Sequence, residues 1–442
     1  MATAPEEAPD LTAATGAAQA EVPPELVAQT FAEYARGYVA RVRNGQSGVL
    51  PVVIGLVAVM VVFEVISPNH VFLSAGNLVN LFEQSAVFIV LAMSETFALL
   101  IGEIDLSIGF VGACGAVIAV QLVQPATTNW PWWAAILAAL AFCAAVGAVQ
   151  GTIISRLGIP SFIVTLAGFL IFNGVMLILL LLGPFSGYPL ISGGISPNTQ
   201  VLFNLMSGTI DPTVSWIAMA VIVLGLAAIM WSADQRRRRS GLVAPPASLT
   251  VLKIVVIAIA GIVVVAVSDI NRANFGVLAG VPWVVPIVLG ILGAWTILLE
   301  RTKFGRSMYA IGGNPEAARR AGINLPVVRT IAFALCSVTA GIGLILYASY
   351  IGGMSNNVQG GQFVLFAVAA AVIGGTSLFG GRGKVIHGVL GGLLIGAIDN
   401  GMYLQNYDVQ RIDIVTGLVL LAAVSIDALS RRSAASGSAA RV

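Results

Sequence analysis

The residues of this chain most able to do chemistry are carboxylates placed within apolar sequence. Residues 100–109 read LIGEIDLSIG and carry Glu103, Asp105 and Ser107, and Glu95 lies deeper in the apolar run before them. Carboxylates inside membrane-spanning sequence are costly and normally face a cavity or a partner. Asp105 and Ser107 can cap the helix that follows them. Alternatively, the segment is irregular and lines a translocation path to which all four residues contribute.

Further polar residues interrupt other apolar runs. They are Gln150, Thr165, Asn173, Asp399 and Asn400. Interhelical hydrogen bonds explain most such residues, although a sugar-sized solute needs the same groups along its route. Residues 352–362 read GGMSNNVQGGQ, a polar and uncharged segment that suits an outer mouth. We therefore take Asn173 and Gln362 as further candidates for lining the path.

Motifs for enzymatic chemistry are close to absent. The chain has two histidines, so no histidine-built metal site is expected, and its three cysteines lie in apolar runs without metal or pairing spacing. Residues 380–384 read GGRGK, but Leu378 replaces the first glycine of a phosphate-binding loop and Val385 follows the lysine. The sequence therefore predicts a protein that is not an enzyme and binds no cofactor or nucleotide itself.

The loop at residues 301–327 is a polar island between apolar runs, and it carries the signals of a short helix. Asn314 can cap this helix, Pro315 and Glu316 suit its first turn, and Gly322 suits the position just past its end. A helix this short is marginal alone. We therefore expect something else to hold it.

The exposed surface of this short helix suits docking. Ala317 and Ala321 lie one turn apart and make a small, flat face that fits a groove. Arg306, Arg319 and Arg320 flank that face. A plain amphipathic surface helix is the alternative. We favour a docking helix, because a chain without its own nucleotide site needs a partner if ATP drives it.

Composition places the chain in a membrane. It has 442 residues, of which 58% are hydrophobic and 10% are charged, whereas a soluble domain has about 25% charged residues. Apolar runs of about 20 residues, long enough to cross the hydrocarbon core, recur along it. They predict an all-α, polytopic transmembrane bundle of about 12 spans, with ten to twelve as the range. The predicted spans are 49–66, 80–101, 107–123, 132–153, 161–183, 213–231, 250–268, 282–299, 328–350, 364–378, 385–402 and 409–428.

The basic residues predict the orientation. If the N-terminus is cytoplasmic, all of the 22 Lys and Arg residues except Arg272 and Arg411 fall at cytoplasmic segments or span ends, as the positive-inside rule requires. Both termini and the loop at 301–327 are then cytoplasmic. The predicted domains are an N-terminal tail with a juxtamembrane helix at 1–45, a transmembrane domain at 46–430 and a C-terminal tail at 431–442.

Two polar breaks in the apolar sequence resemble each other. Residues 101–109 (IGEIDLSIG) and 373–381 (IGGTSLFGG) share Ile, Gly, Leu and Gly at equal offsets. Transporters often carry internal repeats whose helices break at matching places, and the predicted topology makes this pair parallel. Four common residues in nine can also match by chance.

The loop at 301–327 resembles the EAA-type coupling loop of bacterial ABC importer permeases. Three stretches are similar to those of the monosaccharide branch, the ribose, galactose and xylose permeases. They are Leu100–Gly109 (LIGEIDLSIG), Phe304–Gly322 (FGRSMYAIGGNPEAARRAG) and Ala371–Gly383 (AVIGGTSLFGGRG). The chain length, the Glu-Ile-Asp form of the first stretch and the run at Ser161–Leu180 look most like the xylose permeases. The extra length predicts added spans around 200–270.

The resemblance implies an ABC importer permease core that acts as a homodimer in the bacterial inner membrane. A cytoplasmic ATPase, which would hold the ATP and magnesium, would dock on the short helix. An extracytoplasmic sugar-binding protein would deliver a monosaccharide, expected to be xylose or another pentose. The permease would contact lipid but no nucleic acid, and would do no covalent chemistry. The residues implied for ATPase coupling are Gly305, Arg306, Asn314, Glu316, Ala317, Ala318, Ala321 and Gly322.

A proton-coupled secondary transporter is the alternative function, with Glu95, Glu103 or Asp105 carrying the proton. It leaves the loop at 301–327 unexplained. A membrane enzyme would need clustered His, Asp or Cys near one interface, which the chain lacks. Uptake into membrane vesicles distinguishes the two transport mechanisms. Import that persists on a proton gradient with no ATPase subunit present would exclude the ABC importer.

Overall fold

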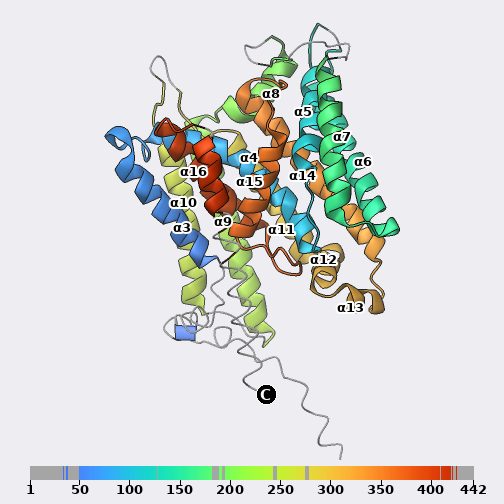
Figure 1. Ribbon diagram of the computed structural model, residues 1–442. Helices are drawn as coiled ribbons and strands as arrows, with labels where there is room; N and C mark the ends of the chain where they lie inside the picture. The colour runs from blue at the N-terminus through green and yellow to red at the C-terminus, as the bar shows by residue number, and fades with distance from the viewer. Residues whose placement is uncertain are drawn as a thin grey trace, which may run out of the picture. The chain divides into compact units, whose positions relative to one another are not determined.

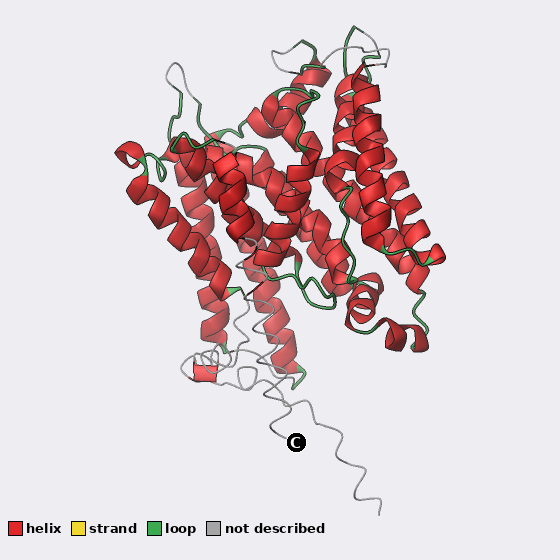
Figure 2. Cartoon of the chain, viewed as in Figure 1, coloured by secondary structure: helices red, strands yellow, loops and turns green. Residues whose placement is uncertain are grey.

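The computed structural model describes most of the chain between residues 49 and 419. The described residues are 33, 36–37, 49–126, 128–181, 189–191, 195–241, 246–273, 278–408, 410–419, 421 and 425. Within them the regular structure is helical, apart from two isolated β-bridges (Figures 1 and 2). The predicted tails lie outside them, except for residues 33, 36 and 37.

The main helices are α3 (Leu50–Ile66), α4 (Ala75–Leu100), α5 (Ile108–Leu122), α6 (Trp132–Leu157), α7 (Ser161–Leu181), α8 (Pro197–Ser207), α9 (Pro212–Arg239), α10 (Ala247–Ser268), α11 (Val284–Arg301), α12 (Lys303–Gly313), α13 (Pro315–Arg320), α14 (Leu325–Ile351), α15 (Gly360–Ile373) and α16 (Val385–Leu404).

Apolar runs in the sequence become helices in the structure. By length and composition, eight of the described helices can cross a membrane, namely α4, α6, α7, α9, α10, α11, α14 and α16. The apolar helices α3, α5 and α15 are shorter. These eleven helices coincide with the first eleven predicted spans. The twelfth is helical over the described residues 410–419, and most of its remainder lies outside the described part of the chain.

Several helix boundaries differ from the predicted ones by four or more residues, and two of these differences have local reasons. Helix α4 begins at Ala75, before the predicted residue 80, because the side chain of Ser74 caps it by accepting from the Asn77 amide at 3.3 Å. Helix α9 continues to Arg239, past the predicted residue 231. Its 28 residues span roughly 42 Å, which exceeds a hydrocarbon core of about 30 Å and carries the terminal arginines beyond it.

The chain forms two compact units. Of the described residues, those within 220–261 and residues 33, 36 and 37 belong to the smaller unit, and the others belong to the larger one. In the smaller unit, the Thr250 hydroxyl on α10 donates to Asp234 Oδ2 on α9 at 2.5 Å. All candidate site residues lie in the larger unit.

Helix α4 forms the centre of the larger unit. Every residue from Ser85 to Leu100 is buried, and α14, α15 and α16 pack along the helix. Glycines bring α16 very close to α4. A methyl group at Gly388 would lie 2.9 Å from the Met93 amide nitrogen, and one at Gly392 would lie 2.6 Å from that of Ile89. Small residues at these positions therefore let the two backbones approach.

The two breaks that resemble each other in sequence make similar hydrogen bonds, although the ends of their helices match one residue out of register with the sequence, which pairs Gly102 with Gly374. Helix α4 ends with the Glu103 amide donating to Ala98 at 3.0 Å, and α15 ends with the Thr376 amide donating to Ala371 at 2.9 Å. Gly102 and Gly375 both have positive φ, which glycine adopts at such helix ends. After each end, a side chain accepts from the amide two residues later. These pairs are Asp105 with Ser107 at 2.9 Å and Ser377 with Phe379 at 3.1 Å.

Candidate functional site

Three stretches far apart in sequence meet at one end of the helices of the larger unit. The Gly381 amide donates to the Leu100 carbonyl at 2.9 Å, and the Tyr309 hydroxyl donates to the Gly383 carbonyl at 2.8 Å. A methyl group at Gly312 would overlap the Leu100 carbonyl oxygen. We call this meeting of α12, the end of α4 and the loop at 374–384 the junction.

Helix α12 is fixed to the bundle at its start. The Gly305 amide donates to the Thr302 hydroxyl at 3.1 Å, and a methyl group at Gly305 would overlap the Leu299 carbonyl oxygen. Met308 and Ile311 of α12 are fully buried. Gly305, a predicted coupling residue, is therefore buried and offers no surface to a partner, whereas Arg306 is exposed.

Helix α13 has the boundaries that the sequence predicts. Asn314 Oδ1 accepts from the amides of Glu316 and Ala317 at 3.1 and 3.0 Å, and Gly322, just past the end, has a φ of 82°. Glu316 and Arg319 form an exposed ion pair at 3.3 Å. This pair adds little stability because water screens it.

Only one face of α13 touches the rest of the chain. Ala318 is buried, with 4% of its surface exposed, and the other residues of α13 are exposed together with Ala321 and Gly322. Figure 1 shows α12 and α13, drawn in gold, at the end of the larger unit. The predicted small face of Ala317 and Ala321 is thus open to a partner, while Ala318 points inward.

Three of the four polar residues around the α4–α5 break form a buried cluster. Glu95, Asp105 and Ser107 have no exposed surface. The Asp105 amide donates to Glu95 Oε1 at 3.2 Å, and Asp105 Oδ1 accepts from the Ser107 amide at 2.9 Å and from its hydroxyl at 2.6 Å. Gln150 Oε1 on α6 lies 3.0 Å from the same hydroxyl. Asp105 therefore shapes the break through a turn onto Ser107, whereas Ser107, the N-cap residue of α5, makes no side-chain capping bond to that helix, contrary to the capping interpretation.

This cluster retains unused hydrogen-bonding capacity. Among the described residues, Glu95 Oε2, Asp105 Oδ2 and Gln150 Nε2 are buried without a partner. Burying such groups costs free energy unless they are neutral or bonded. Each buried polar atom without a partner calls for an explanation, such as a bound water or a functional role.

The remaining candidates of the path lie apart from this cluster. Glu103 forms an ion pair with Arg329 of α14 at 3.4 Å, next to the junction. Asn173 is half-buried on α7. Gln362 lies at the opposite end of the bundle, where it donates to Asp413 Oδ1 at 2.7 Å. The structure thus places the predicted path residues at four separate locations.

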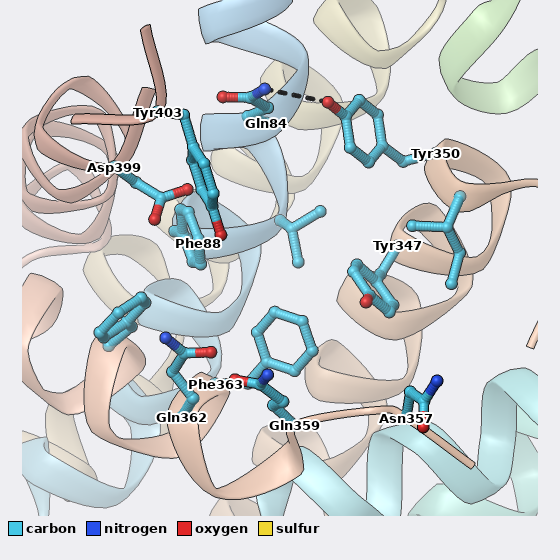
Figure 3. Close-up of a pocket in the computed structure, with 13 residues that line it drawn as sticks. Gln84, Phe88, Tyr347, Tyr350, Asn357, Gln359, Gln362, Phe363, Asp399 and Tyr403 are labelled. Atoms are coloured by element: carbon cyan, nitrogen blue, oxygen red, sulfur yellow. Dashed lines mark hydrogen bonds between the residues drawn. The ribbon is translucent and has the colours of Figure 1, made fainter. Parts of the chain in front are cut away.

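Gln362 lines a cavity of about 390 Å³ between α4, α14, α15 and α16 (Figure 3). We call it the polar cavity. Its wall includes Gln84 from α4, Tyr350 from α14 and the pair Asp399 and Tyr403 from α16. The cavity lies at the ends of α4, α14 and α16 that are remote from the junction. Along α4, Gln84 and Leu100 are separated by roughly 24 Å at the helical rise per residue.

From the sequence, Asp399 is either an interhelical hydrogen-bonding residue or one that faces a solute, and the tyrosines were missed. One signal was present. Tyr347 and Tyr350 are three residues apart, and Asp399 and Tyr403 are four apart, so each pair shares a helix face. Nothing in the sequence indicated that these two faces meet.

Comparison with known proteins agrees with this architecture. Residues 77–424 match the family described as the permease component of branched-chain amino acid transport systems. The xylose transport system permease protein XylH of Escherichia coli K12 is 32% identical over 382 residues, 86% of this chain and 92% of that protein. XylH of Haemophilus influenzae is 34% identical over 385 residues, 85% of this chain and 95% of that protein.

A ribose permease is more distant. The ribose import permease protein RbsC of Escherichia coli K12 is 27% identical over 374 residues, 85% of this chain and 92% of that protein. No solved structure matches the chain. With eight helices able to cross a membrane among its described residues, the chain is a multi-pass protein of the bacterial inner membrane. It belongs to the permease-component family of branched-chain amino acid transport systems, on the branch that resembles the xylose permeases.

Proposed function

We propose that this chain is the membrane-spanning subunit of an ATP-driven monosaccharide importer, with xylose or another pentose as the sugar. It acts as a homodimer with a separate cytoplasmic ATPase and an extracytoplasmic sugar-binding protein. The observation that carries the proposal is the attachment of α13. Its outer residues are exposed, and through α12 it connects to the backbone at the end of α4.

These contacts supply a route for coupling. Closure of the ATPase on ATP and magnesium, both held by that partner, displaces α13 together with α12. The backbone at Gly312 packs directly against that of Leu100 and Gly381, with no room for a side chain. The end of α4 and the start of α16 therefore move with α12. The remote ends of the same helices form the polar cavity, so the motion changes access to it.

The positions of the basic residues in the sequence predict how the chain is oriented in the membrane. Under the positive-inside rule, both termini, α12 and α13 are cytoplasmic, and the polar cavity faces the outer half of the membrane. Helices α3, α5 and α15 then complete a bundle of ten to twelve spans. Helices α9 and α10 account for the extra length predicted around 200–270.

Reversing the charge on α13 tests the ATPase contact. Glu316→Lys is expected to weaken association with the ATPase about tenfold, which corresponds to about 1.4 kcal/mol. Folding and membrane insertion should persist, because the Glu316–Arg319 pair is exposed. Co-purification of the ATPase with the permease over a range of ATPase concentrations measures the effect.

The matched control is Asp408→Lys, the same type of charge reversal at an exposed residue at the other end of the bundle. It should leave ATPase association unchanged. Equal co-purification with Glu316→Lys and with the native chain would count against docking on α13.

The proton-coupled alternative rests on the buried pair of Glu95 and Asp105. It makes a different prediction for vesicles that contain this chain alone. Monosaccharide uptake driven by a proton gradient, with no ATPase present, would replace the ATP-driven proposal.

A further inference from the structure

The polar cavity has an aromatic wall that its own contacts hold in place. The rings of Phe88 and Phe366 lie 5.4 Å apart between centroids, and those of Tyr347 and Phe363 lie 4.7 Å apart, both edge to face. Such contacts stabilise the rings in fixed orientations. The wall therefore presents rigid apolar surfaces to the cavity.

Unused polar groups face the same space. Figure 3 shows Asp399 and Tyr403 on one side and Tyr347 and Tyr350 on the other. Gln84 donates to the Tyr350 hydroxyl at 3.0 Å. In the part of the chain that the structure describes, no hydrogen bond engages the Asp399 carboxylate or the Tyr347 hydroxyl. Polar groups that line a cavity without protein partners are available to a ligand.

A chain of hydrogen bonds fixes the residues around these free groups. Asn400 donates to Gln84 Oε1 at 3.1 Å, and Asn77 donates to Asn400 Oδ1 at 2.9 Å. Gln362 is held by Asp413 at 2.7 Å. A site whose polar groups are already ordered loses less entropy when a ligand binds.

The charge of the cavity defines what can enter it. The described residues that line it include no lysine, arginine or histidine, and Asp399 is the one acidic side chain among them. An anionic ligand would therefore find no cation to pair with in the cavity.

We propose that the polar cavity is a binding site for one neutral monosaccharide inside the permease, with Asp399 as the acceptor for its hydroxyl groups. This inference rests on the proposed function. A carboxylate accepts hydrogen bonds through both oxygens and so matches two adjacent hydroxyls. The C–H face of a sugar ring packs on the aromatic wall. At about 390 Å³ the cavity is within the usual range for small-molecule sites. Sugar phosphates and sugar acids are excluded, because the lining offers no cation to pair with their charge.

Binding of radiolabelled D-xylose to the full-length permease in lipid nanodiscs tests the site. By equilibrium dialysis, Asp399→Asn should weaken binding about fivefold and Tyr347→Phe about threefold, the effects expected for losing one hydrogen bond. The control Asp408→Asn, at an exposed acid outside the cavity lining, should bind D-xylose as the native chain does. D-xylonate, the anionic analogue, should not compete.

Two outcomes would overturn the inference. The first is that both Asp399→Asn and Tyr347→Phe bind D-xylose with native affinity. The second is that D-xylonate competes as strongly as unlabelled D-xylose. Thermal unfolding of each variant identifies any that fails to fold, and Tyr347→Phe, which removes only a hydroxyl, then decides. If the cavity variants bind normally while ATP-driven uptake persists, the cavity inference fails and the proposed function stands. If D-xylose binds as predicted but no ATPase associates with the chain, the proposed function fails alone.

Discussion

Gly312→Ala is expected to reduce ATP-driven uptake at least thirtyfold, whereas Gly313→Ala should leave it near the native rate. A methyl group at Gly312 would overlap the Leu100 carbonyl oxygen and the Gly381 amide nitrogen. Helix α12 would then have to move away from the end of α4. Overpacking of this kind costs about 2 kcal/mol, which is roughly a thirtyfold change in an equilibrium.

Gly313 is a close control for this experiment. It is the neighbouring residue of the same helix, and a methyl group there meets nothing within 4 Å. Both substitutions gain the same helix propensity, about 1 kcal/mol, so any difference between them comes from the junction. The readouts are ATP-driven uptake and ATPase co-purification. We expect Gly312→Ala to keep the ATPase bound but to transmit its motion poorly. Equal uptake by the two variants would show that the junction does not carry the coupling.

Much of the fold follows from local sequence rules. Each long apolar run predicts a helix, and α13 was predicted to within a residue because Asn314, Pro315 and Gly322 act on the backbone next to them. The start of α4 was missed for the same kind of reason, since Ser74 is a capping residue outside the apolar run. Local chemistry therefore explains both the success and the error.

The candidate site depends on contacts that no local rule contains. Ala318, and not Ala317 or Ala321, faces inward because of where α14 passes. Glu103 finds its partner Arg329 more than two hundred residues later. The polar cavity exists only where the ends of several helices converge. Helical spacing predicts which residues share a face, whereas tertiary packing decides what that face meets.

Asp105→Ala is expected to destabilise the chain by about 3 kcal/mol and to abolish most uptake. The substitution leaves the buried Ser107 amide without its acceptor, and the buried Ser107 hydroxyl keeps only Gln150 Oε1 at 3.0 Å. An unsatisfied buried donor costs about 1–3 kcal/mol. The loss should appear as a lower unfolding temperature in detergent, and Asp408→Ala, at an exposed residue, should leave that temperature unchanged.

Asp105→Asn separates the role of Asp105 as an acceptor for Ser107 from a proton-carrying role. The amide keeps one oxygen that can accept from Ser107, so stability should stay within about 1 kcal/mol of the native chain. It cannot release a proton. If ATP drives transport, uptake by Asp105→Asn should therefore remain within about threefold of the native rate, since threefold corresponds to less than 1 kcal/mol. If Asp105 carries a proton in a secondary transporter, the same folded variant should not transport at all. A stable Asp105→Asn protein without uptake would thus favour proton coupling over the ATP-driven proposal. A stable and active one would leave Asp105 as the residue that shapes the α4–α5 break.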